Sequence, residues 1–188
     1  MKKLRAVTAA VLAFATTLSI AGCSNFKVID DEDVFFDALD EAVGIDDDET
    51  YHWKKTEVNG DDVEYIIYAQ DGDNYYTYIR FEDAEDAMDF FDEAYDDFED
   101  VIKDKDFEGS HSMSMNKTRG MILFDGDLDD SSEIMLYSRS LYNYDDIEIY
   151  GGVYVNQNVY IEVFTVNGSK RDREKIDMFL KEIGFPKP

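Results

Sequence analysis

Residues 51–81 read YHWKKTEVNGDDVEYIIYAQDGDNYYTYIRF, and they predict three consecutive strands joined by two turns. Apolar and polar side chains alternate along this stretch, as they do in a strand that buries one face. The turns are expected at Asn59-Gly60 and at Asp71-Gly72-Asp73, because these residue types suit tight hairpin connections. The strands are expected at 51–58, 63–70 and 74–81. The stretch therefore predicts an antiparallel meander.

The same pattern recurs later in the chain. Sliding the sequence so that Asn59 falls on Asn143 also places Tyr76 on Tyr160. This alignment predicts a tandem βββα duplication with halves at about 50–103 and 133–184, the second with strands near 133–142, 147–155 and 158–166. One long duplicated unit indicates two halves of a single domain and not a solenoid. The competing interpretation is a chance alignment of short, tyrosine-rich strands.

Three amphipathic helices flank the predicted strands, near 31–43, 83–103 and 169–183. The order of elements contains no βαβ alternation. It favours an α+β fold, an antiparallel sheet with amphipathic helices on one face. This layout resembles that of the β-lactamase-inhibitor-protein type of fold, and the similarity is one of layout alone.

The beginning of the chain has its own pattern. Lys2, Lys3 and Arg5 precede an uncharged run that ends in Ile20-Ala21-Gly22-Cys23, and Cys23 is the only cysteine. This resembles a bacterial lipoprotein signal. The resemblance implies that a diacylglyceryl group is added to the Cys23 sulfur and that the chain is cut before this residue. A plain secretory signal would need no cysteine, and the uncharged run is shorter than the roughly 20 apolar residues of a membrane-spanning helix.

From this we expect a signal peptide at 1–22, a lipidated tether at 23–29 and a single α+β domain at 30–188. The resemblance also implies a location at a bacterial cell membrane or envelope, lipid-anchored on the extracytoplasmic side. Two lipid chains would hold such a protein firmly, because each buried methylene contributes about 0.8 kcal/mol. The sequence gives no indication of oligomeric state.

Composition limits the partners. The chain of 188 residues carries 44 Asp and Glu against 18 Lys and Arg, a net charge of −26. Such a charge argues against nucleic acid and against anionic lipid as partners of the domain, because phosphate groups require clustered Lys and Arg. An aromatic content of 14% indicates that the acidic chain nevertheless folds.

A tyrosine surface is the first candidate site. Strand alternation is expected to place six tyrosines on the sheet face that the helices leave open: Tyr68, Tyr76, Tyr78, Tyr150, Tyr154 and Tyr160. Half-exposed tyrosines offer flat rings and hydroxyls to a protein, peptide or glycan partner. The alternative is that tyrosine simply suits an exposed strand.

An acidic stretch is the second candidate. Asp125-Gly126-Asp127-Leu128-Asp129-Asp130 resembles the opening of an EF-hand-like calcium loop, with Asp125, Asp127 and Asp129 as candidate ligands. The sequence departs from that pattern at the sixth and twelfth positions, which are Asp130 and Leu136 and not glycine and glutamate. A solvated turn is the competing interpretation.

Signatures of catalysis are missing from the sequence. The only histidines are His52 and His111, and no nucleophile-elbow, metalloprotease or phosphate-binding motif is present. We therefore expect a non-catalytic binding module without a cofactor. The first alternative is a calcium-responsive acidic domain. The second is a carboxylate-based hydrolase of envelope glycans, because a pair of carboxylates needs no short motif.

Overall fold

A computed structural model describes residues 26–130, 134, 136–138 and 145–188. The helices in this part of the chain are α1 (Glu32–Ala38), α2 (Ala84–Asp104) and α3 (Lys170–Glu182), with a π-helical turn at Leu39–Val43 and a 3-10 turn at Asp47–Glu49. The strands are β1 (Tyr51–Val58), β2 (Asp61–Asp71), β3 (Asn74–Phe81), β4 (Phe107–Asn116), β5 (Arg119–Asp130), β6 (Asp145–Asn156) and β7 (Val159–Thr165). None of the described helices is long and apolar enough to cross a membrane.

The predicted meander is confirmed. Strands β1, β2 and β3 pair consecutively and antiparallel. The turn between β1 and β2 consists of Asn59, with φ of 54°, and Gly60, with φ of 104°. Two successive positive φ angles match the right-handed twist of a hairpin, and Asn-Gly is the pair that adopts them most easily.

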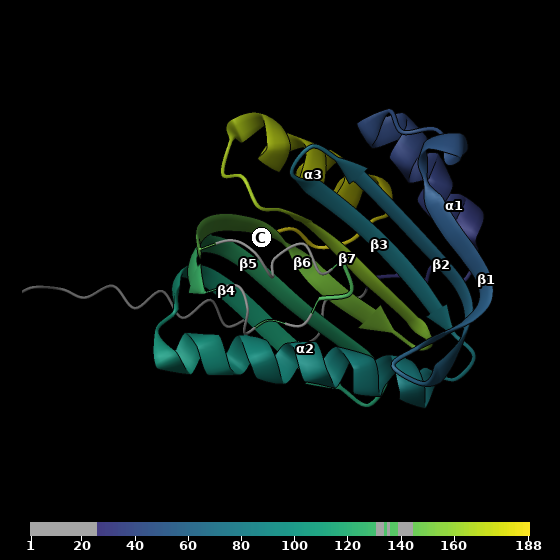
Figure 1. Ribbon diagram of the computed structural model, residues 1–188, viewed down its shortest axis with the longest axis horizontal. Coiled ribbons are helices and arrows are strands. Elements are labelled where there is room, and N and C mark those ends of the chain that lie inside the picture. The colour runs from purple at the N-terminus through teal and green to yellow at the C-terminus, as the bar shows by residue number, and fades with distance from the viewer. Residues whose placement is uncertain (1–25, 131–133, 135, 139–144) are drawn as a thin grey trace, which may run out of the picture.

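The described strands form one antiparallel sheet in the order β1-β2-β3-β7-β6-β5-β4. β3 and β7 are neighbours near its centre, and β1 and β4 are its edges. Helix α2 follows β3 and crosses the sheet to reach the far edge at β4 (Figure 1). The α+β class predicted from the order of elements is confirmed.

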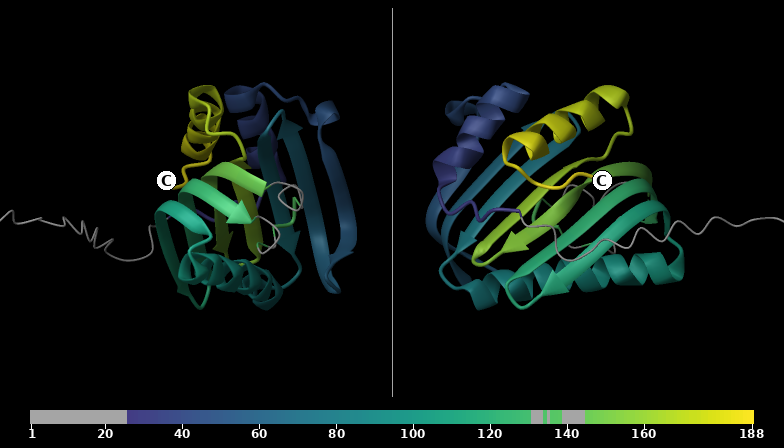
Figure 2. Two further views of the ribbon diagram at one scale, coloured as in Figure 1. Left: turned by 60° about the vertical axis from the view of Figure 1, so that its left-hand side comes forward. Right: turned by 180° about the vertical axis from the view of Figure 1, so that it is seen from behind.

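The helices cover both faces of the sheet, whereas we predicted them on one (Figure 2). The buried side of α2, including Phe91 and Phe98, packs on one face. Helices α1 and α3 pack on the other. The reason lies in the central strands, because every residue of β7 is buried and a strand that is apolar on both faces needs cover on both.

The ungapped alignment of the two sequence halves does not keep every aligned side chain on the same face of the sheet, and the tandem duplication stays a prediction. Tyr76 and Tyr160 align in sequence, but Tyr76 faces α1 and α3 and Tyr160 faces α2. Val63 and Ile147, another aligned pair, both pack on the α2 side. The strand expected near 133–142 falls mostly outside the described residues, and Ile134 and residues 136–138 are not in a strand.

Candidate functional site

The predicted tyrosine surface does not exist as an exposed face. Four of the six tyrosines, Tyr76, Tyr78, Tyr150 and Tyr154, are buried under α1 and α3. Tyr160 is buried on the opposite face, and half-buried Tyr68 packs against that same side. The prediction was wrong because it assumed an uncovered face and one register for all six side chains. A shift of one residue moves a strand side chain to the other face.

The hydroxyls of these tyrosines mostly bind the protein itself. Tyr78 donates to the Ile29 carbonyl, Tyr150 to Asp177 and Tyr154 to the Pro186 carbonyl, at 3.0, 2.6 and 2.7 Å. Tyr68 donates to Gln70 at 3.1 Å, and Tyr160 donates to Glu162 at 2.7 Å. The Tyr76 hydroxyl is buried, and it has no hydrogen-bond partner among the described residues. The hydroxyls of Tyr78, Tyr150 and Tyr154 therefore tie the two terminal segments and α3 to the sheet, whereas those of Tyr68 and Tyr160 bind within their own strands.

The acidic stretch is part of a strand and not of a loop. Asp125, Asp127 and Asp129 lie on β5, where an extended backbone spaces alternate carboxylates along the strand. Asp125 binds the guanidinium of Arg173 at 2.6 Å. Within the described ranges, no group of three or more acidic, histidine or cysteine side chains could hold a metal ion. The EF-hand-like geometry expected from this stretch is therefore not formed.

A pocket of about 580 Å³ opens on the α2 side of the sheet, between β1, β2, α2 and residues 136–138. We call it the aromatic pocket. Its wall contains four aromatic and two acidic side chains, Trp53, Tyr68, Phe90, Tyr137, Glu57 and Glu93. No lysine or arginine is among the described residues that line it. Of the six predicted tyrosines, only Tyr68 reaches this pocket.

Trp53 is the most exposed large ring of the pocket. It is 45% exposed and stacks on Tyr51, which is 63% exposed, with the ring centroids 6.5 Å apart and the planes inclined by 15°. Both rings lie on β1, an edge strand. Exposed neighbouring rings at the mouth of a pocket are typical of binding surfaces.

A buried carboxylate holds one wall of the pocket in place through hydrogen bonds. Glu162 on β7 is 0% exposed, and its oxygens accept hydrogen bonds from the Tyr160 hydroxyl at 2.7 Å and from the backbone N–H groups of Tyr137 and Ser138 at 2.5 and 3.2 Å. Burial raises the pKa of Glu162, and these hydrogen bonds oppose that rise. Because Tyr137 and Ser138 line the pocket, Glu162 sets the position of its wall.

Glu162 cannot act as a catalytic group on a bound substrate. It has no exposed surface, and both of its oxygens accept hydrogen bonds from the protein. The sequence analysis passed over it, although one signal was present. It is the only charged residue of β7, Val159–Thr165, and an isolated acid in an apolar strand requires buried partners.

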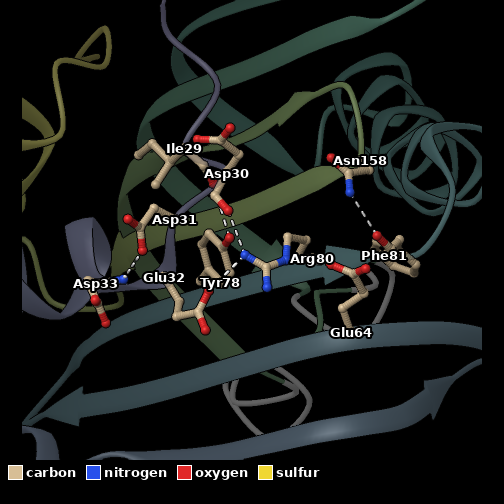
Figure 3. A network of polar contacts seen from close by, with 10 residues as sticks. All are labelled: Ile29, Asp30, Asp31, Glu32, Asp33, Glu64, Tyr78, Arg80, Phe81 and Asn158. Atoms are coloured by element: carbon tan, nitrogen blue, oxygen red, sulfur yellow. Dashed lines mark hydrogen bonds and ion pairs between the residues drawn. The ribbon is translucent and has the colours of Figure 1, made fainter.

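The N-terminal segment, residues 26–31, is bound across the sheet face opposite α2. Three sheet side chains donate to its backbone carbonyls: Asn156 to Phe26 at 3.0 Å, Tyr78 to Ile29 at 3.0 Å and Arg80 to Asp30 at 2.5 Å. Figure 3 shows the Tyr78 and Arg80 contacts. Arg80 also forms ion pairs with Glu32 at 2.7 Å and Glu64 at 2.8 Å.

This segment corrects the boundary predicted for the tether. We expected residues 23–29 to link the lipid to a domain that starts at residue 30. Phe26 and Ile29 are instead buried, at 3% and 5% exposure. Phe26 packs against Phe185 and Tyr154, with centroid distances of 4.6 and 5.8 Å. The folded part of the chain therefore begins no later than Phe26.

Comparisons with known proteins found no match for this chain among protein-family models, curated proteins or solved structures. Any functional assignment consequently depends on the chemistry of the chain itself.

Proposed function

We propose that the chain is a non-catalytic binding module, lipid-anchored on the extracytoplasmic side of a bacterial membrane, that holds a basic peptide segment of a partner protein in the aromatic pocket. The observation that carries this proposal is the composition of the pocket, where Trp53, Tyr68, Phe90 and Tyr137 accompany Glu57 and Glu93, and no Lys or Arg is among the described lining residues.

This composition favours a positively charged side chain with an apolar stem. A Lys or Arg head group within about 6 Å of a tryptophan face gains about 0.5–2 kcal/mol from the ring quadrupole. The two glutamates supply opposite charge at the same place, and the apolar stem of Lys or Arg covers ring surface. The net charge of −26 would also attract a basic partner and raise its association rate.

Trp53 reports directly on this site, because it is the only tryptophan of the chain. We expect its fluorescence to change saturably with a short peptide that contains arginine and a tyrosine. We expect little change with the matched peptide in which citrulline, a neutral analogue, replaces arginine. Glu93→Gln should weaken binding of the arginine peptide by about tenfold, corresponding to about 1.4 kcal/mol.

The matched control is Asp96→Asn, which removes one charge from the same helix outside the pocket. It should change the affinity only slightly, as a screened surface charge does. Equal weakening by Glu93→Gln and Asp96→Asn would mean that the acidic surface attracts the peptide without a specific site. Equal binding of the arginine and citrulline peptides would reject the charge-based recognition.

Lipidation at Cys23 is tested separately from the pocket. We expect the full chain, expressed in a bacterium supplied with an alkyne fatty acid, to incorporate the label and to sediment with membranes. Cys23→Ala should abolish labelling, because the lone cysteine supplies the only thiol to which the lipid can be attached. Ser24→Ala serves as the control and should be labelled as the wild type is. Labelling of Cys23→Ala would refute lipidation at this residue.

The two alternative functions have weaker support. A calcium-responsive domain would need free carboxylates on β5, and Asp125 is bound to Arg173. A glycan hydrolase would need two accessible carboxylates across a substrate site. Glu57 and Glu93 line the same pocket, but we explain their presence there by the recognition of a cation and not by hydrolysis.

A further inference from the structure

The N-terminal segment gives the proposed lipid anchor a defined direction. Phe26 is fixed to the sheet, and Cys23 lies only three residues before it. Three residues span at most about 11 Å even when fully extended. A lipid on Cys23 would therefore hold Phe26 within about 11 Å of the membrane surface. The domain could not rotate freely on so short a link.

We propose that the corner of the domain around Phe26 docks on the bilayer and that the aromatic pocket faces away from it. This inference rests on the lipid anchor of the proposed function, but not on the ligand of the pocket. We call this region the anchor corner. It comprises the N-terminal segment, the β4–β5 turn at residues 117–118 and the C-terminal residues 185–188.

Contacts of Phe26 identify the corner. The ring lies 4.6 Å from that of Phe185, and the Arg119 guanidinium stands over it at 5.3 Å. Arg119 is the first residue of β5, directly after the turn from β4. The Pro186 carbonyl accepts a hydrogen bond from Tyr154, which brings the C-terminal residues to the same place. The right-hand view of Figure 2 shows the N-terminal segment and the C-terminus on one face of the sheet.

The charge of the anchor corner differs from that of the rest of the domain. Its residues carry Lys27, Lys117 and Lys187 against Asp30 and Asp31, Arg119 follows the turn directly, and Lys187 forms an ion pair with Asp177. Basic residues at a membrane surface are attracted by anionic lipids. The domain as a whole is repelled by such lipids, so these side chains favour one orientation over the others.

The aromatic pocket lies far from this corner. Phe26 packs on the face opposite α2, whereas the pocket opens on the α2 side. Trp53 is on β1, and Tyr154 beside Phe26 is on β6, four strands away in the sheet. Four strand spacings correspond to about 19 Å, in addition to the thickness of the sheet. Docking at the anchor corner would leave the pocket open to a partner in solution.

The single cysteine of the chain makes this orientation measurable. If lipid occupies Cys23, a second cysteine can be labelled alone. We would place a fluorophore at Thr118→Cys in the β4–β5 turn, or at Glu108→Cys near the other end of β4, both exposed positions. Residues 108 and 116 of this strand are about 27 Å apart. The lipidated full chain would be reconstituted in vesicles of phosphatidylethanolamine and phosphatidylglycerol that contain a headgroup quencher.

We expect several-fold stronger quenching at residue 118 than at residue 108. A Gly-Ser insert of ten residues after Ser24 should reduce quenching at 118 toward the value at 108, because the longer link frees the domain. Equal quenching at both ends of β4 in the chain without the insert, or stronger quenching at 108, would overturn the proposed orientation.

Failure of the anchor gives a different result from failure of the orientation. Without lipidation the chain would not float with the vesicles. The chain without an added cysteine would then react with a thiol reagent at Cys23. With lipidation but no fixed orientation, the chain would float and the two labels would be quenched alike.

Discussion

Glu162→Ala is expected to lower the free energy of unfolding by about 3 kcal/mol, because it leaves the Tyr160 hydroxyl and the N–H groups of Tyr137 and Ser138 without their acceptor. The same change should release the wall of the aromatic pocket and alter the emission of Trp53. Urea denaturation of the full chain in mild detergent, followed by circular dichroism, measures the first effect. Native-state fluorescence measures the second.

The comparison variant is Glu174→Ala, which removes an exposed carboxylate that pairs with Lys170 on the surface. It should change the free energy of unfolding by less than about 0.5 kcal/mol. If Glu162→Ala were as mild as Glu174→Ala, the buried carboxylate would not fasten the 137–138 wall.

The stability difference between the wild type and Glu162→Gln should also depend on pH. Burial raises the pKa of Glu162 above its ordinary value of 4.5. The folded state therefore binds this proton more tightly than the unfolded state does. The resulting stability is fully present below pH 4.5 and is lost as the pH rises through the folded pKa. Glu162→Gln cannot titrate, so the wild type should lose stability relative to this variant across that window.

Phe179→Ala is expected to lower the free energy of unfolding by about 3–5 kcal/mol. Phe179 is fully buried and connects α3 with α1 and β3, since its ring lies 5.1 Å from Phe35 and 4.9 Å from Tyr76. Truncation leaves a cavity between two helices and the sheet. A loss of this size should reduce the Tm of the full chain by roughly 10 °C in a thermal melt followed by circular dichroism.

Two neighbours provide the controls for Phe179. Met178→Ala changes the adjacent residue of α3, which is 49% exposed, and should cost less than about 0.5 kcal/mol. Tyr76→Phe removes a buried hydroxyl for which the described part of the chain offers no hydrogen-bond partner, so it should be neutral or slightly stabilising. A Phe179→Ala variant as stable as Met178→Ala would contradict the packing described for the α1–α3 side of the sheet.

Much of the fold follows from local sequence patterns. The β1 and β3 bounds and those of α2 and α3 agree with the predicted ranges within one residue at each end. Asn59-Gly60 specified the first hairpin through backbone angles that few other pairs adopt readily. These features depend on residues close together in the chain, and local patterns therefore contain the information.

Most of the candidate site was not predicted from the sequence, because its residues lie far apart along the chain. Trp53, Phe90 and Tyr137 come from a strand, a helix and a connecting segment, and nothing in their spacing along the chain indicates that they meet. The tyrosines were found by a correct alternation rule but assigned to an exposed face. Alternation distinguishes the two faces of a strand, whereas exposure depends on what packs over each face.

By itself, the sequence determined the antiparallel α+β class, the bounds of β1, β3, α2 and α3, and the strongly acidic charge, because hairpin turns, hydrophobic periodicity and composition act locally or additively. Only the tertiary structure decided that the helices cover both faces, that the tyrosine hydroxyls bind within the protein and that Glu162 fastens a pocket wall. These outcomes depend on contacts between segments as far apart as Phe26 and Asn156. The reason is that burial is a property of the packed molecule. The degree of burial decides whether a strand residue belongs to the core, supports a neighbouring segment or lies on a surface that can bind a partner.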